Sequence, residues 1–142
     1  MQKDKARFDL ARQLHLSGRI EEAQKIYTEL CKKYKDNHIL FYLLGTTFLQ
    51  IKKYDQAIFN LEKSININSN YPDSYNNLGV SLAEIKKYSE AIEKYNKAIV
   101  VKNDYIDAYL NRGISLNKLK KYNEAIKDFN LVIKYQPENI KA

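Results

Sequence analysis

Hydrophobic residues recur every three to four positions through most of this chain, which is the spacing that gathers side chains on one face of an α-helix. The pattern is clearest over residues 74–99. There Leu78, Leu82 and Ile85 mark the apolar face of one helix, and the apolar face of a second helix begins at Tyr88. Helices this short are marginal in water unless they pack on something. The pattern therefore predicts a helical hairpin that needs further hairpins around it.

Copies of this hairpin follow one another with a period of 34 residues. The repeat is strict at one alanine and nearly strict at one small residue of each copy: Ala23, Ala57, Ala91 and Ala125; Ala11, Gly45, Gly79 and Gly113. Self-similarity at a fixed period is the signature of a stacked repeat array. We divide the chain into units 4–37, 38–71, 72–105 and 106–139, with residues 140–142 opening a fifth unit.

Each unit is expected to contain two helices joined by a tight turn at Gly18 or at a lysine pair. The expected helices are 4–17, 20–33, 38–51, 55–67, 72–85, 89–101, 106–119 and 123–135. Pro72 suits a first helical turn, and Pro137 follows the last helix. The small residues let two helix backbones approach closely, while large residues such as Tyr95 and Phe129 fill the gap to the next hairpin.

The repeat unit resembles the tetratricopeptide repeat (TPR), which has a Leu-Gly pair, a large residue three places on, then an alanine, another large residue and a proline. The matching residues are Leu78, Gly79, Leu82, Ala91 and Tyr95 in the third unit, and Gly113, Leu116, Ala125, Phe129 and Pro137 in the fourth. Arg112 stands where leucine is usual, and Ser69 and Asn103 stand where proline is usual. The first unit is the loosest copy, with Leu10-Ala11 for Leu-Gly and Arg7 for the leading aromatic residue. The resemblance implies an all-α, right-handed α-solenoid of four TPR units forming one domain over residues 1–142.

Composition agrees with a soluble, helical protein. Of 142 residues, 44% are hydrophobic and 29% are charged, with 2 prolines and 4 glycines. The single cysteine, Cys31, excludes an internal disulfide framework and suits a reducing compartment. The first residues lack the apolar segment of a signal peptide. The longest apolar run, residues 39–49, is too short to cross a bilayer. We therefore expect a cytoplasmic protein with no membrane partner.

The formal charge of +7 is concentrated partly at the turns. Lysine pairs at 52–53, 86–87 and 120–121 fall one period apart and would form a basic ridge that Arg19 continues. Solvated turns explain this pattern most simply, and an electrostatic footprint for nucleic acid or an acidic partner is the alternative. The tyrosine after each pair (Tyr54, Tyr88, Tyr122) is expected on the packing face, where no base could stack on it. Nucleic acid is therefore a disfavoured partner.

In TPR proteins the first helix of each unit lines a concave groove that grips an extended peptide or a partner's helix. The resemblance implies the same role here, with a protein or peptide ligand. The candidate groove residues are Phe8, Arg12, Ile39, Tyr42, Leu43, Thr46, Asp73, Asn76, Asn77, Val80, Glu84, Asp107, Asn111 and Lys118.

Two features of this set bear on the ligand. Asn77 and Asn111 lie one period apart and resemble two rungs of the asparagine ladder of some TPR peptide binders, although asparagine is common throughout the chain. The first half of the set is apolar and the second is acidic, which would fit a ligand with apolar anchors at one end and basic residues at the other. Alternatively, Ile39 and Leu43 pack between neighbouring helices. The carboxylate clamp of chaperone-binding TPR domains is excluded, because Asp73 and Asp107 stand where it has lysine.

Catalysis finds little support. His15 and His38 lack a nucleophile-and-base pattern around them, and Cys31 with His38 would leave a zinc site two ligands short. We expect no enzymatic activity, cofactor or metal within the chain. The alternative is that the chain forms the N-terminal recognition arm of a larger enzyme, such as a glycosyl-, sulfo- or methyltransferase.

The last helix ends the array with an apolar face formed by Ile126, Phe129, Val132 and Ile133. Solenoids usually end in a capping unit with a polar outer face. We therefore expect either that the chain is a fragment of a longer array, or that its open end docks on another copy.

Overall fold

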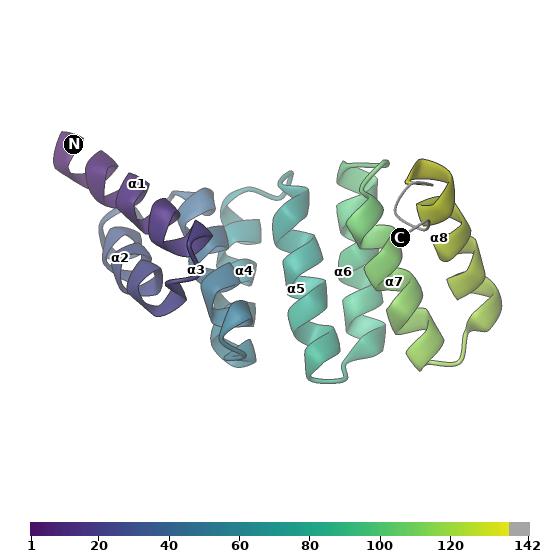
Figure 1. The fold of residues 1–142 in the computed structure, drawn as a ribbon. Coiled ribbons are helices and arrows are strands. Elements are labelled where there is room, and N and C mark those ends of the chain that lie inside the picture. The colour runs from purple at the N-terminus through teal and green to yellow at the C-terminus, as the bar shows by residue number, and fades with distance from the viewer. Residues whose placement is uncertain (137–142) are drawn as a thin grey trace. The chain divides into compact units, whose positions relative to one another are not determined.

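The computed structural model describes residues 1–136, which form eight α-helices and no strand (Figure 1). Their bounds are α1 Gln2–Leu16, α2 Ile20–Lys33, α3 His38–Gln50, α4 Tyr54–Ile67, α5 Pro72–Glu84, α6 Tyr88–Val101, α7 Ile106–Lys118 and α8 Tyr122–Tyr135. Residue contacts group them into two units, one over Met1–Ser69 with α1–α4 and one from Asn70 onward with α5–α8. Each unit consists of two helical hairpins, so the all-α prediction is confirmed.

The helix boundaries agree with the expected ones to within two residues. The main difference is that α4, α6 and α8 each begin one residue earlier, at the tyrosine that follows the lysine pair. Pro72 occupies the first turn of α5 as expected. Residues 137–142 lie outside the described part, and with them Pro137, the end of the fourth predicted unit and the predicted opening of a fifth.

Every hairpin turns on one residue with a left-handed backbone. These residues are Gly18, with φ 84°, and Lys52, Lys86 and Lys120, with φ between 62° and 66°. Around Lys86, its own N–H donates to Ala83 O at 2.9 Å and the Lys87 N–H donates to Leu82 O at 2.9 Å. These two bonds form a Schellman motif, which satisfies the last carbonyls of the preceding helix. Glycine normally occupies this position because other side chains are strained there.

Within a hairpin, the small residue of the first helix faces the large residue of the second. A Cβ added to Gly79 would lie 2.5 Å from Cε1 of Tyr95, and one added to Gly113 would lie 2.6 Å from Cε1 of Phe129. These separations are well inside van der Waals contact, so the helices cross as closely as the glycines predict. Tyr95 also hydrogen-bonds with Ser115 of α7, so it reaches the next hairpin too.

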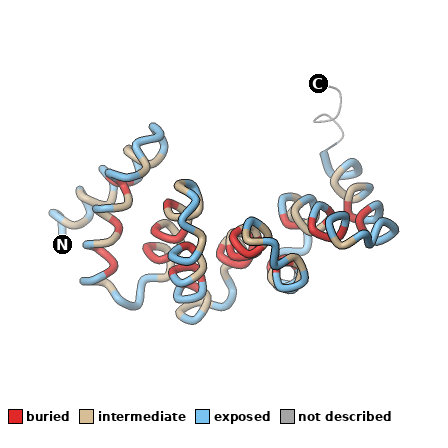
Figure 2. The backbone as a smooth tube through the Cα atoms, turned by 90° about the horizontal axis from the view of Figure 1, so that it is seen from below, coloured by how far each residue is buried: buried red, intermediate tan, exposed pale blue. Residues whose placement is uncertain are grey.

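Burial follows the same plan. Figure 2 shows buried and exposed stretches alternating along the helices. The four repeated alanines are at most 2% exposed. In the first unit, a core cluster joins α1, α2 and α3 through Ala11, Tyr27, Leu30 and Leu44 among others.

Polar contacts fasten α1 at its beginning. The Tyr34 hydroxyl donates to Asp4 Oδ2 at 2.7 Å, and the Lys33 ammonium donates to the same oxygen. The hydrogen bonds from Lys33 and Tyr34 lower the pKa of Asp4 to about 2. A carboxylate on α1 is thereby tied to the end of α2.

One expectation about the turns is wrong. Tyr54 and Tyr88 are half-buried, but Tyr122 is 54% exposed and does not lie on a packing face. Within the described residues the extensive contacts of α8 are with α7, and Tyr122 lies at the exposed beginning of α8.

Candidate functional site

The first helices of the two hairpins in the first unit, α1 and α3, form a surface pocket of about 350 Å³. Its lining residues are Arg12, His15, Leu16, Tyr27, Leu43 and Gln50. Arg12, His15 and Leu16 share a face of α1 because residues three and four apart are neighbours on a helix. Leu43 and Gln50, two turns apart on α3, form the opposite wall. Two predicted groove residues, Arg12 and Leu43, therefore lie in one pocket.

His15 ties the two walls of this pocket together. Its Nε2 lies 2.6 Å from Oε1 of Gln50, and its Nδ1 lies 3.5 Å from the Tyr27 hydroxyl. An amide oxygen only accepts hydrogen bonds, so Nε2 of the ring donates to Gln50 while Nδ1 faces the Tyr27 hydroxyl. Burial raises the pKa of Tyr27 to about 12, although Arg12 acts in the opposite direction. The Tyr27 hydroxyl therefore remains a donor at neutral pH, and the imidazole is held from both sides.

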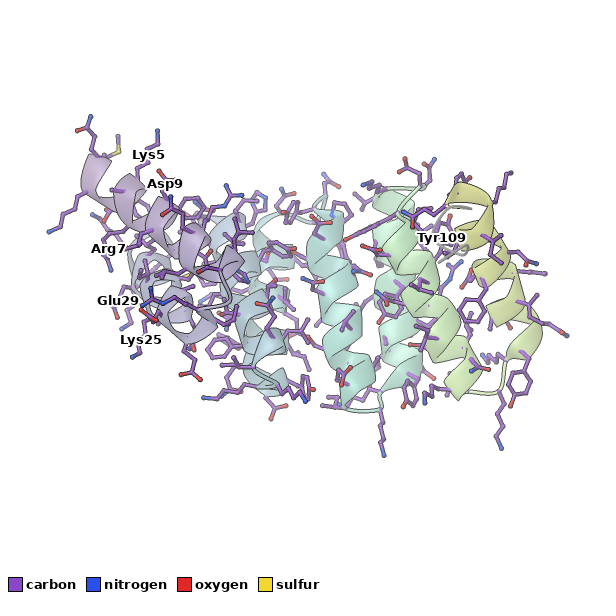
Figure 3. The ribbon with its side chains drawn as sticks, viewed as in Figure 1. Lys5, Arg7, Asp9, Lys25, Glu29 and Tyr109 are labelled. Atoms are coloured by element: carbon purple, nitrogen blue, oxygen red, sulfur yellow. The ribbon has the colours of Figure 1, made fainter. Side chains whose placement is uncertain are left out.

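Arg12 supplies the positive charge of this face. Its guanidinium lies over the Phe8 ring, 5.9 Å from the ring centroid, and the side chain is exposed. Lys5 and Asp9 also project from α1, so the helix carries both signs of charge (Figure 3). The other predicted residues on α3, Ile39, Tyr42 and Thr46, are half-buried. The Thr46 hydroxyl donates to the Tyr42 carbonyl oxygen of its own helix at 2.8 Å.

In the second unit, α5 and α7 are joined by a pair of amides. Asn111 Nδ2 donates to Asn76 Oδ1 at 3.1 Å. Asn76 is only 6% exposed, so its amide orients Asn111 and offers little surface of its own. Asn77, the other rung of the predicted ladder, is half-buried. Asn111 therefore bonds to Asn76, and not to Asn77, the residue one repeat period earlier.

The remaining predicted residues of the second unit differ in exposure. Glu84, Asp107 and Lys118 are exposed, and Val80 is half-buried. Asp73 is half-buried and accepts a hydrogen bond from the Tyr105 hydroxyl at 2.6 Å. The acidic character expected of this half is therefore carried by Glu84 and Asp107, with Lys118 partly offsetting it.

A second polar centre of this unit lies between α6, α7 and α8 and was missed by the sequence reasoning. Arg112 donates to both Asp128 oxygens, at 2.8 and 2.6 Å, and to Asn96 Oδ1 at 2.9 Å. The hydrogen bonds with Asp128 raise the pKa of Arg112 against the effect of burial. The guanidinium also lies 5.3 Å from the ring centroid of Tyr109, which Figure 3 labels on α7. The sequence did contain a signal for this ion pair. In the fourth unit Arg112 replaces the usual leucine, and the same unit has Asp128 where the third unit has Lys94.

Groups that carry chemistry are sparse. Cys31 is a free, buried thiol whose pKa burial raises to about 12, so it is a poor nucleophile. Within residues 1–136, no three His, Cys, Asp or Glu side chains gather closely enough to hold a metal ion. Over the same residues, the structure contains no helix with the length and apolar character that crossing a bilayer requires.

Comparisons with known proteins agree with this architecture. The family model described as TPR repeat matches residues 45–86 and 81–120, and models described as Tetratricopeptide repeat match residues 5–37 and 106–139. A comparison with curated proteins gave no match.

Several solved structures share the fold. A crystal structure of MamA superposes with a TM-score of 0.88 at 24% identity, covering 98% of this chain and 81% of that one. MamA 41-end from Desulfovibrio magneticus RS-1 gives 0.87 at 19% identity, covering 94% and 76%. YrrB, described as a TPR protein with an unusual peptide-binding site, gives 0.84 at 20% identity, covering 96% and 71%. With repeat models matching most of its length and a helical-solenoid fold, this chain belongs to the tetratricopeptide repeat family.

Proposed function

We propose that this chain is a protein-interaction scaffold that binds a peptide or a partner's helix on the first helices of its hairpins. Membership of the TPR family and the solenoid fold support an interaction scaffold. The observation that carries the finer proposal is the pocket between α1 and α3. Arg12 and Leu43 line its opposite walls, and His15 links these walls through its bond with Gln50. YrrB, one of the structures with this fold, is described as having a peptide-binding site.

The first unit suits a ligand segment that has an apolar side chain next to a hydrogen-bond acceptor. Leu16 and Leu43 give the pocket its apolar wall. Arg12, at its edge, carries five N–H donors in a planar fork suited to a carboxylate or a backbone carbonyl. Because His15 already bonds Gln50 and Tyr27, the walls are set before a ligand arrives, which lowers the entropy cost of binding.

The second unit offers a different contact, suited to a peptide backbone beside a basic side chain. An amide has two N–H donors and two acceptor lone pairs, and the bond to Asn76 uses one donor of Asn111. Glu84 and Asp107, both exposed on the first helices of their hairpins, would attract a lysine or arginine of the ligand. The best-fitting ligand therefore has an apolar anchor for the first unit and a basic, extended segment for the second.

A display library of random extended peptides, selected on the immobilised chain, tests this proposal. Selected peptides are then titrated by calorimetry against Leu43→Glu, Asn111→Ala and the control Phe59→Ala, an exposed residue of the second helix α4. We expect Leu43→Glu to weaken binding at least tenfold and Phe59→Ala to leave it unchanged. Equal binding by all three variants, or loss in the control alone, would overturn the proposal.

A further inference from the structure

The two ends of the array are the least buried parts of the described chain. Only Ala11 is buried in α1, and only Ala125 and Asp128 are buried in α8, whereas each helix between them buries three or more residues (Figure 2). Repetition allows each exposed position to be compared with the same position in another hairpin, one or more periods of 34 residues away.

The contact between α6 and α7 shows how this repeat covers the second helix of a hairpin. Tyr95 of α6 is 1% exposed and hydrogen-bonds with Ser115 of α7, and Arg112 of α7 donates to Asn96 of α6. Ala98, one turn on from Tyr95, is fully buried. The second helix thus presents its large residue and the turn that follows to the first helix of the next hairpin.

The face that α6 buries is exposed on α8. Ile126 and Ile133 are 53% and 47% exposed, while their counterparts one period earlier, Ile92 and Ile99, are half-buried. Val132 is half-buried where Ala98 is fully buried. The side of α8 that would receive another hairpin's first helix is therefore an apolar surface.

The complementary face is exposed on α1. Leu10 is 48% exposed, and Ala6 and Gln13 are exposed as well. The same three positions in α3 are Leu40, Leu44 and Thr47, which are at most 5% exposed. In α7 they are Ala108, Arg112 and Ser115, of which the first and last are at most 1% exposed and Arg112 bonds α6. On α1, the face that meets a preceding second helix elsewhere in the chain is uncovered.

We propose that α1 of one copy of this chain packs on α8 of a second copy, repeating between molecules the contact that joins α6 to α7. The chain carries both halves of this contact, so no other partner is needed to complete it. Leu10 takes the place of Arg112, and no unpaired charge is buried. Phe129 takes the place of Tyr95. In the α6–α7 contact the Tyr95 hydroxyl bonds Ser115, whose counterpart on α1 is Gln13, and Phe129 has no hydroxyl that needs such a partner.

This contact is heterologous, because it joins two different surfaces. A heterologous contact leaves one α1 face and one α8 face free in every assembly that does not close into a ring. The expected products are therefore short linear oligomers that lengthen with concentration. Each face belongs to a single helix, so we expect association only at high concentration.

Sedimentation of the full chain over about 1 μM to 1 mM tests the proposal. We expect the weight-average mass to rise from 16.7 kDa toward and beyond twice that value. Leu10→Asp and Ile133→Asp should each keep the chain monomeric, since each places a charge on one face. Both residues are exposed, and circular dichroism checks that each variant folds. The control Val100→Asp alters an 82% exposed residue of α6 outside both faces and should associate like the parent.

Mixing the two variants gives the sharpest result. Leu10→Asp keeps an intact α8 face and Ile133→Asp keeps an intact α1 face, so an equal mixture should form a dimer that cannot grow. A parent chain that stays monomeric over the whole concentration range would overturn the proposal. A mixture that stays monomeric, or association lost in Ile133→Asp but retained in Leu10→Asp, would equally overturn it, the latter indicating contact between two α8 helices.

Discussion

Replacing Gly79 by alanine tests the close helix crossing that organises every hairpin. The added Cβ would lie 2.5, 2.8 and 2.9 Å from three ring atoms of Tyr95, where ordinary contact begins near 3.4 Å. The ring cannot easily move away, since Tyr95 is 1% exposed and is also hydrogen-bonded to Ser115. Overpacking of this kind costs about 1–3 kcal/mol. Alanine returns about 1 kcal/mol through its higher helix propensity. The net expectation is a loss of roughly 0–2 kcal/mol in the free energy of unfolding, centred near 1 kcal/mol.

The first hairpin supplies the matched control, because Ala11 stands there at the same position opposite Tyr27, and both residues are fully buried. Ala11→Gly relieves no overlap and loses helix propensity, so it should also destabilise, by about 1 kcal/mol. The two substitutions are chemical opposites, yet both should lower stability. Urea unfolding followed by circular dichroism measures both, with the slope checked for constancy. A Gly79→Ala variant more stable than the parent by about 1 kcal/mol, the full propensity gain, would refute the packing argument.

Four further outcomes follow from features of single residues. Lys86→Gly should raise the free energy of unfolding by up to about 1 kcal/mol in urea, because glycine relieves the left-handed strain; a clear loss would contradict this. Arg112→Leu should cost about 3–5 kcal/mol by leaving a buried carboxylate unpaired, and adding Asp128→Leu should recover most of that loss. Cys31 should resist thiol reagents at pH 8 and react fully in denaturant; fast labelling of the native chain would contradict its burial. Asp4 has a lowered pKa, so its contribution to stability is present above pH 4 and disappears as the pH falls toward 2; Asp4→Asn should flatten the stability profile in that range.

The repeat pattern predicted the helices well because each copy confirmed the others. A helix boundary proposed from one unit had to suit positions 34 residues away, and the structure differs from the expected bounds by at most two residues. Periodicity also marked Gly79 as a point of close helix approach and Tyr95 as a packing residue, although Tyr95 was expected against the next hairpin and also packs on Gly79 of its own. It could not show that Lys86 adopts a left-handed backbone, because lysine is not the residue that this conformation normally selects.

The candidate site was predicted less completely, since it depends on contacts that break the period. Arg12 and Leu43 were expected on the binding face, but the bonds by which His15 links the walls of their pocket were not predicted. Asn76 was expected to face a ligand and is buried beneath Asn111. In both places a single side chain pairs with a residue of another hairpin, which the periodicity of one helix cannot specify.

The bonds of Arg112 also bear on how the array comes apart. Three helices meet at one guanidinium, which grips a carboxylate on α8 and an amide on α6 at once. Peeling α8 away under tension would strip that cation of its counterion, so the final hairpin should not fray turn by turn. The slowly exchanging amides of α8 should instead exchange at the same rate as those of α6, because both helices open in one event that the last two hairpins share.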